Sequence, residues 1–442
     1  MSEGVDGFGT GALQRRPPFG DNPDVGTRGA QTQQRILRAA LAVFDEVGYH
    51  DCGIDRIAAK AECSRPSFYQ YFSSKEDLFR LLSGDLARRL FDITSATGRI
   101  TPDAAGWAAL RSFVQAYGDV YDVYAPVFAV FSTAVAVDSV VASGAGRVFR
   151  RQASDLLSRV DRRAFQQRRP EVVVSVLLNG LSRAQRFRRV VGGGRVTDVG
   201  RSRSDDSLAD VMHRSFFGPR PGVNVREHVV AKSGRRSVPA TIGRGPDGVT
   251  GSLGQAGRIT RDRLLDAGRE VFAEHGYHDT RVDDIVALAD TSHGTFYRYF
   301  ENKQALFRII AARSGRRVID AIDELPGVAD QPGRNASGEL RRWLSQYFGV
   351  YAKEGPIIRA WIEAVWADQE LRKASPAQVE VFRRRLAECL SARGFGDVDS
   401  DAATLMALLD RSQPVLSATA ADEASVVDAF VLVLRRGLFG AR

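Results

Sequence analysis

The chain carries one distinctive run twice, first as Ser64-Arg65-Pro66-Ser67-Phe68-Tyr69-Gln70-Tyr71-Phe72 and again as Ser292-His293-Gly294-Thr295-Phe296-Tyr297-Arg298-Tyr299-Phe300. Each run combines small polar residues with aromatic residues. The similarity extends outward from the runs, because residues 32–79 align without a gap onto residues 260–307, with 23 identities in 48 positions. A repeat of this length indicates two copies of one structural unit in tandem.

Hydrophobic periodicity predicts three helices in each copy. Apolar residues within 36–44 and within 264–272 recur on one face of a helix with 3.6 residues per turn. Gly48 and Gly276 then offer the left-handed conformation that ends a helix. Two short helices joined by a tight turn form a helix-turn-helix, whose second helix enters the major groove of DNA. The predicted fold class is therefore all-α, with the short helices at residues 54–61, 65–72, 282–289 and 293–300.

These runs and the lysines that follow them closely resemble the signature of the TetR family of regulators. In that family a three-helix head precedes an all-helical domain that binds a small effector and dimerises. The resemblance therefore implies two tandem TetR-like units, each with both parts. It assigns base reading to Arg65, Pro66, Ser67 and Gln70, and to His293, Gly294, Thr295 and Arg298. It assigns phosphate contacts to Tyr69, Tyr71 and Lys75, and to Tyr297, Tyr299 and Lys303.

The chemistry of these side chains agrees with that division. Arginine pairs with guanine and glutamine pairs with adenine through two hydrogen bonds, and small side chains meet the methyl group of thymine. Phosphate contacts set the register on DNA, whereas base contacts specify the sequence. A plainer interpretation exists beside each role, because Phe68 and Phe296 suit a core and Arg65 and Arg298 also suit a solvated surface.

Two positions in each head depart from the family pattern. The usual turn glycine is replaced by Glu62 and Asp290, of which only aspartate tolerates a left-handed backbone well. We therefore expect slight strain in the first head. A basic residue early in the second helix is replaced by Asp55 and Asp283, which suit a helix N-terminus but repel phosphate. This replacement argues against base contacts from that helix.

The repeat also defines the domain boundaries. Residues 1–30 are predicted to form a disordered leader, and residues 220–258, rich in Gly, Pro, Ser and Arg, a flexible linker. Apolar faces within 172–181 and 405–409 are expected to pair the two units. The predicted domains are a head at 31–80, a helical regulatory and dimerisation domain at 81–219, a second head at 259–308 and a second helical domain at 309–442.

Composition narrows the class of protein. Only six of the 62 basic residues are lysine, so the net charge of +9 fits a polyanionic partner but also fits a genome that favours arginine codons. Cys52, Cys63 and Cys389 form neither a disulfide framework nor a metal-binding spacing, which favours a reducing, cytoplasmic compartment. The longest apolar stretch, residues 126–137, is too short to span a membrane.

No cofactor, metal ion or catalytic activity is expected. His275 and His278 lie three residues apart, but no cysteine or acidic cluster completes a metal site. No nucleophile or paired-carboxylate arrangement argues for an enzyme. The ligand-binding residues stay unassigned, because aromatic residues of the helical domains suit either an effector pocket or a packed core. These residues are Trp107, Tyr117, Tyr121, Phe128, Trp343, Tyr347, Trp361 and Trp366.

The sequence predicts a DNA-binding transcriptional regulator, a repressor released by a small-molecule effector. The long linker lets the two units fold back into an intramolecular pseudo-dimer, and a homodimer is the alternative. Because the base-reading residues differ between the heads, the expected partner is a double-stranded DNA operator with unlike half-sites. The rival hypothesis is a small-molecule-binding or scaffold protein in which one helix-turn-helix, more readily the first, has lost DNA binding.

Overall fold

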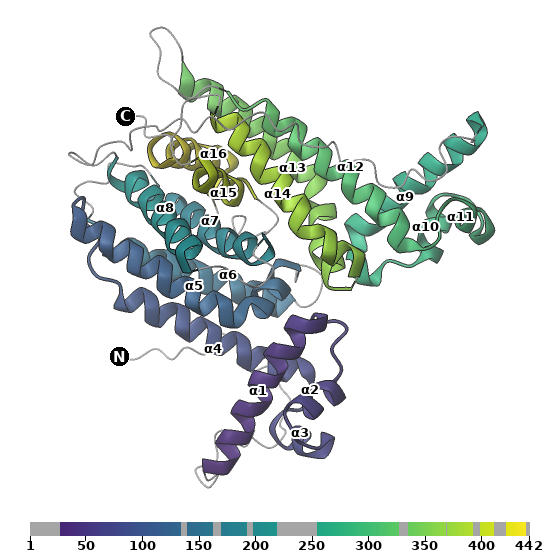
Figure 1. Cartoon of the computed structure of the whole chain (residues 1–442), viewed down its shortest axis with the longest axis horizontal. Helices are drawn as coiled ribbons and strands as arrows, with labels where there is room; N and C mark the ends of the chain where they lie inside the picture. The colour runs from purple at the N-terminus through teal and green to yellow at the C-terminus, as the bar shows by residue number, and fades with distance from the viewer. Residues whose placement is uncertain are drawn as a thin grey trace.

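The expected all-α fold is confirmed by the computed structural model of the chain (Figure 1). Within the described part, one isolated bridge joins Ile100 and Val160, and no helix there is long and apolar enough to cross a membrane. Most of the predicted leader and linker lies outside that part. The structure describes residues 27–133, 139–161, 169–191, 198–218, 254–326, 335–367, 369–391, 398–410 and 421–438.

The two units repeat one order of helices. The first unit comprises α1 (Thr27–Val47), α2 (Ile54–Lys60), α3 (Arg65–Tyr71), α4 (Lys75–Ala96), α5 (Ala104–Thr133), α6 (Ser139–Arg159), α7 (Pro170–Val191) and α8 (Asp198–Phe217). The second comprises α9 (Gln255–Asp279), α10 (Val282–Leu288), α11 (His293–Tyr299), α12 (Lys303–Asp323), α13 (Ala336–Ala367), α14 (Gln369–Ser391), α15 (Val398–Leu409), α16 (Glu423–Leu432) and the π-helical turn η4 (Val433–Leu438). Head 1 is α1–α3 and head 2 is α9–α11; in Figure 1 they lie at the bottom and at the right of the bundle.

Two predicted boundaries are wrong by a few residues. α1 begins at Thr27, inside the predicted leader, and α9 begins at Gln255, inside the predicted linker. Both extra turns are polar, so the apolar periodicity that set the predicted starts does not reach them. The ends were predicted better, because Gly48 and Gly276 have φ angles of 79° and 74° as expected. Gly276 kinks α9 rather than ending it.

The turn inside each helix-turn-helix adopts a left-handed backbone at a residue other than glycine. Glu62 has a φ of 51° and Asp290 a φ of 47°. A side chain in this region crowds the backbone at a cost of roughly 1–2 kcal/mol, and aspartate bears it better than glutamate. The expected strain therefore sits in the turn before each recognition helix, and more of it in head 1.

Glycine at position 62 is expected to stabilise head 1. The change Glu62→Gly removes the side-chain crowding, and backbone amides of α1–α3 should exchange with deuterium about fivefold more slowly, since ~1 kcal/mol is a factor of about five. Asp290→Gly is the matched control and should slow exchange in head 2 by less. Unchanged or faster exchange in head 1 of the first variant would contradict the strain.

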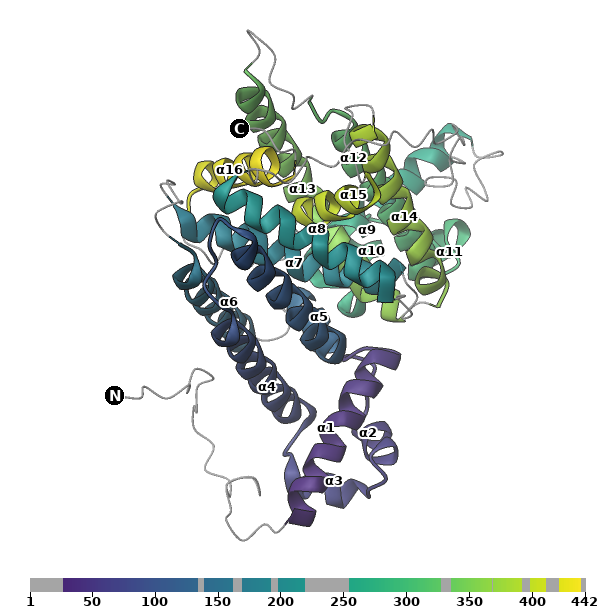
Figure 2. The ribbon, with the colours of Figure 1, turned by 60° about the vertical axis from the view of Figure 1, so that its left-hand side comes forward.

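The two units share one hydrophobic core. α7 packs against α15 and α8 packs against η4, so the last helices of each unit form a common junction, seen with α15 and α16 beside α7 and α8 in Figure 2. Buried residues of head 1 and of both helical domains belong to one cluster, whereas head 2 forms a second cluster with α13. The faces at 172–181 and 405–409 lie in this junction.

Equivalent residues of the two units meet in the junction. The run from Leu181 to Gln185 aligns with the run from Leu409 to Gln413, so Gly180 and Leu408 hold the same place in their units. A Cβ atom on Gly180 would lie only 2.6 Å from Cδ2 of Leu408. Glycine thus leaves the space that leucine fills. Two copies of the first unit would oppose glycine with glycine, and two copies of the second would oppose leucine with leucine, so the packing fits unlike units.

Candidate nucleic-acid interface and ligand cavity

The side chains assigned to DNA contact lie on the outer faces of α3 and α11. Tyr69 is 45% exposed and Tyr297 is 56% exposed, which is high for a large aromatic side chain. Phe68 and Phe296, one position earlier, are fully buried, which confirms their place in the core. Each recognition helix therefore shows one face to the core and the other to solvent. The other assigned residues of α3 and α11 are exposed or half-buried: Arg65, Pro66, Ser67, Gln70, Tyr71, His293, Gly294, Thr295, Arg298 and Tyr299.

A serine caps each recognition helix at its N-terminus. The side chain of Ser64 accepts a hydrogen bond from the backbone N–H of Ser67 at 3.2 Å, and Ser292 accepts one from Thr295 at the same distance. Such a cap satisfies a backbone donor that the helix itself leaves unpaired. The cap thereby fixes the backbone of the third residue in each recognition helix.

The first residue of each recognition helix is held by an aspartate of the preceding helix. Nη1 of Arg65 lies 3.2 Å from Oδ2 of Asp55, and Nε2 of His293 lies 2.9 Å from Oδ1 of Asp283. These exposed pairs contribute little to stability, so their effect is to orient the side chain. Sequence reasoning assigned the aspartates to the helix N-terminus and missed this contact, although their recurrence in both copies was a signal for it.

The two signature lysines bind the backbone of their own heads. Nζ of Lys303 donates to the carbonyl oxygens of Tyr277, His278 and Thr280 at 2.8, 3.2 and 2.8 Å. An ammonium group has three donors, so none is left for a phosphate. Burial lowers the pKa of Lys303, in keeping with this enclosed position. Nζ of Lys75 makes two bonds of the same kind, to Tyr49 and His50. The structure thus engages Lys303 with backbone carbonyl groups, and its contact with phosphate stays a prediction.

The heads meet at a pair of equivalent histidines. The rings of His50 and His278 stack with centroids 4.8 Å apart and planes 24° from parallel. Burial lowers the pKa of both rings, and each lies near a lysine. The neighbouring charged groups are Lys75, Lys303, Asp51 and Asp279, and the carboxyl group of Glu363 lines the same small space. The neutral rings are thus favoured where the heads touch.

This contact is expected to weaken in acid. The pKa of each histidine is lower in the folded protein than in the unfolded chain, so the unfolded form takes up protons first as the pH falls below ~6.5. Stability conferred by the stack is present above that pH and lost below it. The double variant His50→Phe and His278→Phe keeps stacked rings without a titrating group. Its melting temperature should fall less between pH 7.5 and pH 5.5 than that of the native protein.

The matched control for that comparison is His275→Gln. His275 lies on the surface near the end of α9, outside the stack. This variant should keep the full pH dependence of the native protein. An equal pH dependence of the double variant and the native protein would show that the stacked pair does not set it.

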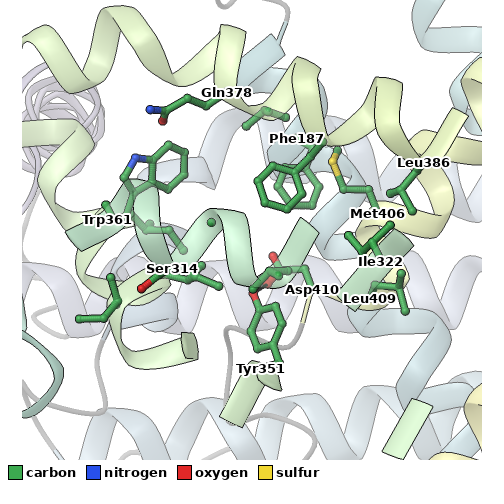
Figure 3. Close-up of a pocket in the computed structure, with 18 of the residues that line it drawn as sticks. Phe187, Ser314, Ile322, Tyr351, Trp361, Gln378, Leu386, Met406, Leu409 and Asp410 are labelled. Atoms are coloured by element: carbon green, nitrogen blue, oxygen red, sulfur yellow. Dashed lines mark hydrogen bonds between the residues drawn. The ribbon is translucent and has the colours of Figure 1, made fainter. Parts of the chain in front are cut away.

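A cavity of about 140 Å³ lies within the second helical domain (Figure 3). Its walls come from α12, α13, α14 and α15, and α7 of the first unit contributes Arg186 and Phe187. Trp361 and Phe187 face each other across the space in Figure 3. The lining is mainly apolar, as is usual where a bundle binds a small molecule.

The aromatic candidates of the second unit divide between the cavity and the core. Tyr347 and Trp361 line the cavity. Trp343 is buried and donates its indole N–H to the carbonyl oxygen of Ala321 at 2.8 Å. The side chain of Trp366 lies outside the described residues. Two of the aromatic residues named from the sequence thus take part in a possible binding site.

The aromatic candidates of the first unit pack against one another. Phe128 stacks on Tyr121 with ring centroids 4.6 Å apart, and Tyr117 lies next to the same ring at 6.1 Å. The match of Val120-Tyr121 with Val350-Tyr351 places Ile358 where the first unit has Phe128. Ile358 lines the cavity. A ring in the first unit therefore occupies the place that a smaller side chain leaves in the second.

One end of the cavity is an ion cluster that joins the two units. Asp410, after α15, accepts a hydrogen bond from the hydroxyl of Tyr351 at 2.6 Å. It forms ion pairs with two arginines of α7, Arg186 and Arg183, the latter at 3.7 Å. Asp410 is 5% exposed and Arg183 only 1%. Nothing in the local sequence pattern pointed to this cluster, because Arg186 lies 224 residues before Asp410 in the chain.

Two helix-turn-helix heads with exposed second helices, each joined to a helical bundle, define a tandem helix-turn-helix protein. Residues 36–82 and 264–310 each match the family model for bacterial regulatory proteins of the tetR family. The chain therefore carries two tetR-family domains in tandem, in agreement with the resemblance of the sequence.

Individual relatives match over the same kind of segment. The chain is 37% identical over 70 residues to the uncharacterized HTH-type transcriptional regulator YdgC of Bacillus subtilis, covering 16% of this chain and 36% of that protein. It is 44% identical over 90 residues to the HTH-type transcriptional repressor DhaR of Mycobacterium sp., covering 20% and 42%. It is 35% identical over 109 residues to the HTH-type transcriptional activator FasR of Mycolicibacterium smegmatis, covering 24% and 48%. The chain thus spans between a third and a half of each of these relatives.

Proposed function

We propose that the chain is a DNA-binding transcriptional regulator in which both heads contact one operator. The observation that carries the proposal is the recognition helix that occurs twice, with a buried phenylalanine on its inner face and an exposed tyrosine on its outer face. Similarity to named transcriptional regulators supports it. Tyrosine hydroxyls and backbone N–H groups bind phosphate oxygens without a charge, which suits heads whose lysines are engaged elsewhere.

The operator is expected to have unlike half-sites. The residues assigned to base reading differ at each compared position, from Arg65 against His293 to Gln70 against Arg298. Glutamine is suited to adenine and arginine to guanine. Asp55 and Asp283 orient Arg65 and His293, so the two heads also present different side chains at the first position of the recognition helix. A chain with two such heads reads a sequence that a symmetric dimer cannot match.

The two units act as a pseudo-dimer within one chain in this proposal. The pairing of Gly180 with Leu408 supports unlike units, and the ion cluster adds a second reason. Ser182 is the residue of the first unit that aligns with Asp410. Two copies of the first unit would therefore bring Arg183 and Arg186 together without a carboxylate, and an unpaired buried charge is costly.

The cavity is the proposed site of an effector that releases DNA. Two helices connect it to the heads. α7 contributes Arg186 to the cavity, and three residues later Arg189 forms an ion pair with Asp45 of head 1. α13 contributes Trp361, and two residues later Glu363 accepts a hydrogen bond from the backbone N–H of Tyr277 in head 2 at 2.7 Å. A ligand that favours one arrangement of these helices changes the spacing of the heads.

The second candidate function is a protein in which one head no longer binds DNA. The left-handed Glu62 in head 1 favours that head as the inactive one. In this case the chain binds a small molecule or acts as a scaffold, and head 2 alone contacts DNA. Comparison of the two heads by matched substitution separates the two functions.

Each head is expected to lose affinity when its outer face is changed. The double variants Tyr69→Phe with Gln70→Ala, and Tyr297→Phe with Arg298→Ala, each remove one phosphate contact and one base contact. Both should weaken binding to genomic fragments selected with the native protein by at least about tenfold, as one good base contact is worth ~1–3 kcal/mol. Fluorescence anisotropy at fixed salt measures the affinity.

The control variant for this experiment is Arg384→Ala, on the exposed surface of α14, which should bind as the native protein does. Loss of affinity in only one of the double variants would favour the second candidate function. Equal binding of the native protein to all sequences would refute operator recognition, and a palindromic operator would refute unlike half-sites.

A further inference from the structure

The cavity in the second helical domain has polar donors without a hydrogen-bond partner in the part of the chain that the structure describes. Nη2 of Arg186 binds Asp410, but Nη1 of the same guanidinium is buried and has no hydrogen-bond partner. The hydroxyl of Ser314, which is 1% exposed, also lacks a partner. Both residues line the cavity. A buried donor without a hydrogen-bond partner destabilises the folded protein, so the site is incomplete as it stands.

The charges beside the cavity do not balance. Arg183 and Arg186 bring two positive charges, and Asp410 is the carboxylate that pairs with both. Burial lowers the pKa of Arg183 to about 10, so it keeps its charge at neutral pH. Two nitrogen atoms of Arg183 have no hydrogen-bond partner, and one of them, Nε, lies 3.7 Å from Oδ2 of Asp410. A net positive charge in an enclosed, mainly apolar region is stabilised by an anion.

The cavity has the volume of one aromatic ring. An engineered protein cavity of ~150 Å³ holds a benzene molecule, and the cavity here measures about 140 Å³. Its apolar wall includes Trp361, Val379 and Phe382. A ring bearing one small anionic group fits both the volume and the charge.

We propose that this cavity binds a small aromatic carboxylic acid of the benzoate class. The ring lies in the apolar part of the cavity, and the carboxylate accepts a hydrogen bond from Nη1 of Arg186, the donor that Asp410 leaves without a partner. The inference rests on the proposed function, because this ligand would be the effector. Binding brings a second anion to Arg186 of the first unit, beside Asp410 of the second, and so acts directly on the junction between the units.

One ligand binds per chain. The first unit fills the equivalent place with Phe128, which stacks on Tyr121, and Ile358 stands at that position in the second unit. A pseudo-dimer therefore senses the acid on one side alone.

Calorimetric titration of the full chain without DNA tests the inference, with benzoate as the probe and benzamide as its neutral counterpart. Benzoate should bind with one site per chain and at least tenfold more tightly than benzamide. Asp410→Asn removes the negative charge beside the proposed carboxylate position, so benzoate should bind this variant more tightly still and benzamide should not. Equal affinities for the two probes, or no binding of benzoate, would overturn the inference.

A second pair of variants locates the site. Ile358→Phe introduces the ring found in the first unit and should abolish binding of benzoate, whereas Ile358→Val should retain it. Thermal melting checks that both variants fold. Benzoate binding that persists in Ile358→Phe would show that the acid lies elsewhere and would overturn the assignment.

The outcomes separate this inference from the proposed function. Selective DNA binding without benzoate binding would refute the benzoate site and would leave the proposed function as a regulator unaffected. Benzoate binding in a chain that binds all DNA sequences equally would retain the cavity assignment and refute operator recognition.

Discussion

Gly180 of α7 faces Leu408 of α15, and close to them Arg183 and Arg186 face Asp410. Both contacts join residues from similar places in two similar units, yet the members of each contact differ in size or in charge. Because the two units differ at these positions, their surfaces are complementary in shape and in charge at this junction. The shared core, the position of the heads and the closing wall of the cavity all depend on this pairing.

Polar contacts link each head to a long helix of the bundle. Arg189 of α7 reaches Asp45 in head 1, and Glu363 of α13 reaches the backbone of head 2. Between the heads the equivalent histidines, His50 and His278, stack on each other. The arrangement is therefore nearly symmetric where the heads meet and asymmetric inside the bundle. That combination suits a protein with two similar DNA-binding surfaces and a ligand cavity in its second helical domain.

The sequence predicted what depends on local pattern. The repeat placed the short helices α2, α3, α10 and α11 within one residue, and Gly48 and Gly276 adopt the left-handed backbone expected of them. The buried phenylalanines of the recognition helices follow from the same periodicity. The apolar periodicity does not extend into the polar first turns, so α1 and α9 begin earlier than predicted.

Contacts between distant segments could not be predicted in this way. The donors of Lys303 are taken up by carbonyl groups more than twenty residues earlier, a position that side-chain type alone does not reveal. Trp361 was a candidate for a pocket, but the choice between pocket and core depends on Ile358 and on α7 of the other unit. The ion cluster at Asp410 joins the two halves of the chain, so it exists only after they have packed.

The mass of the purified protein in dilute solution tests the central claim most directly. Light scattering at neutral pH is expected to give the mass of a single chain, 48.4 kDa, because the two units of one chain satisfy each other's junction. A mass equal to two chains, whether through like units or through units exchanged between chains, would contradict pairing within the chain.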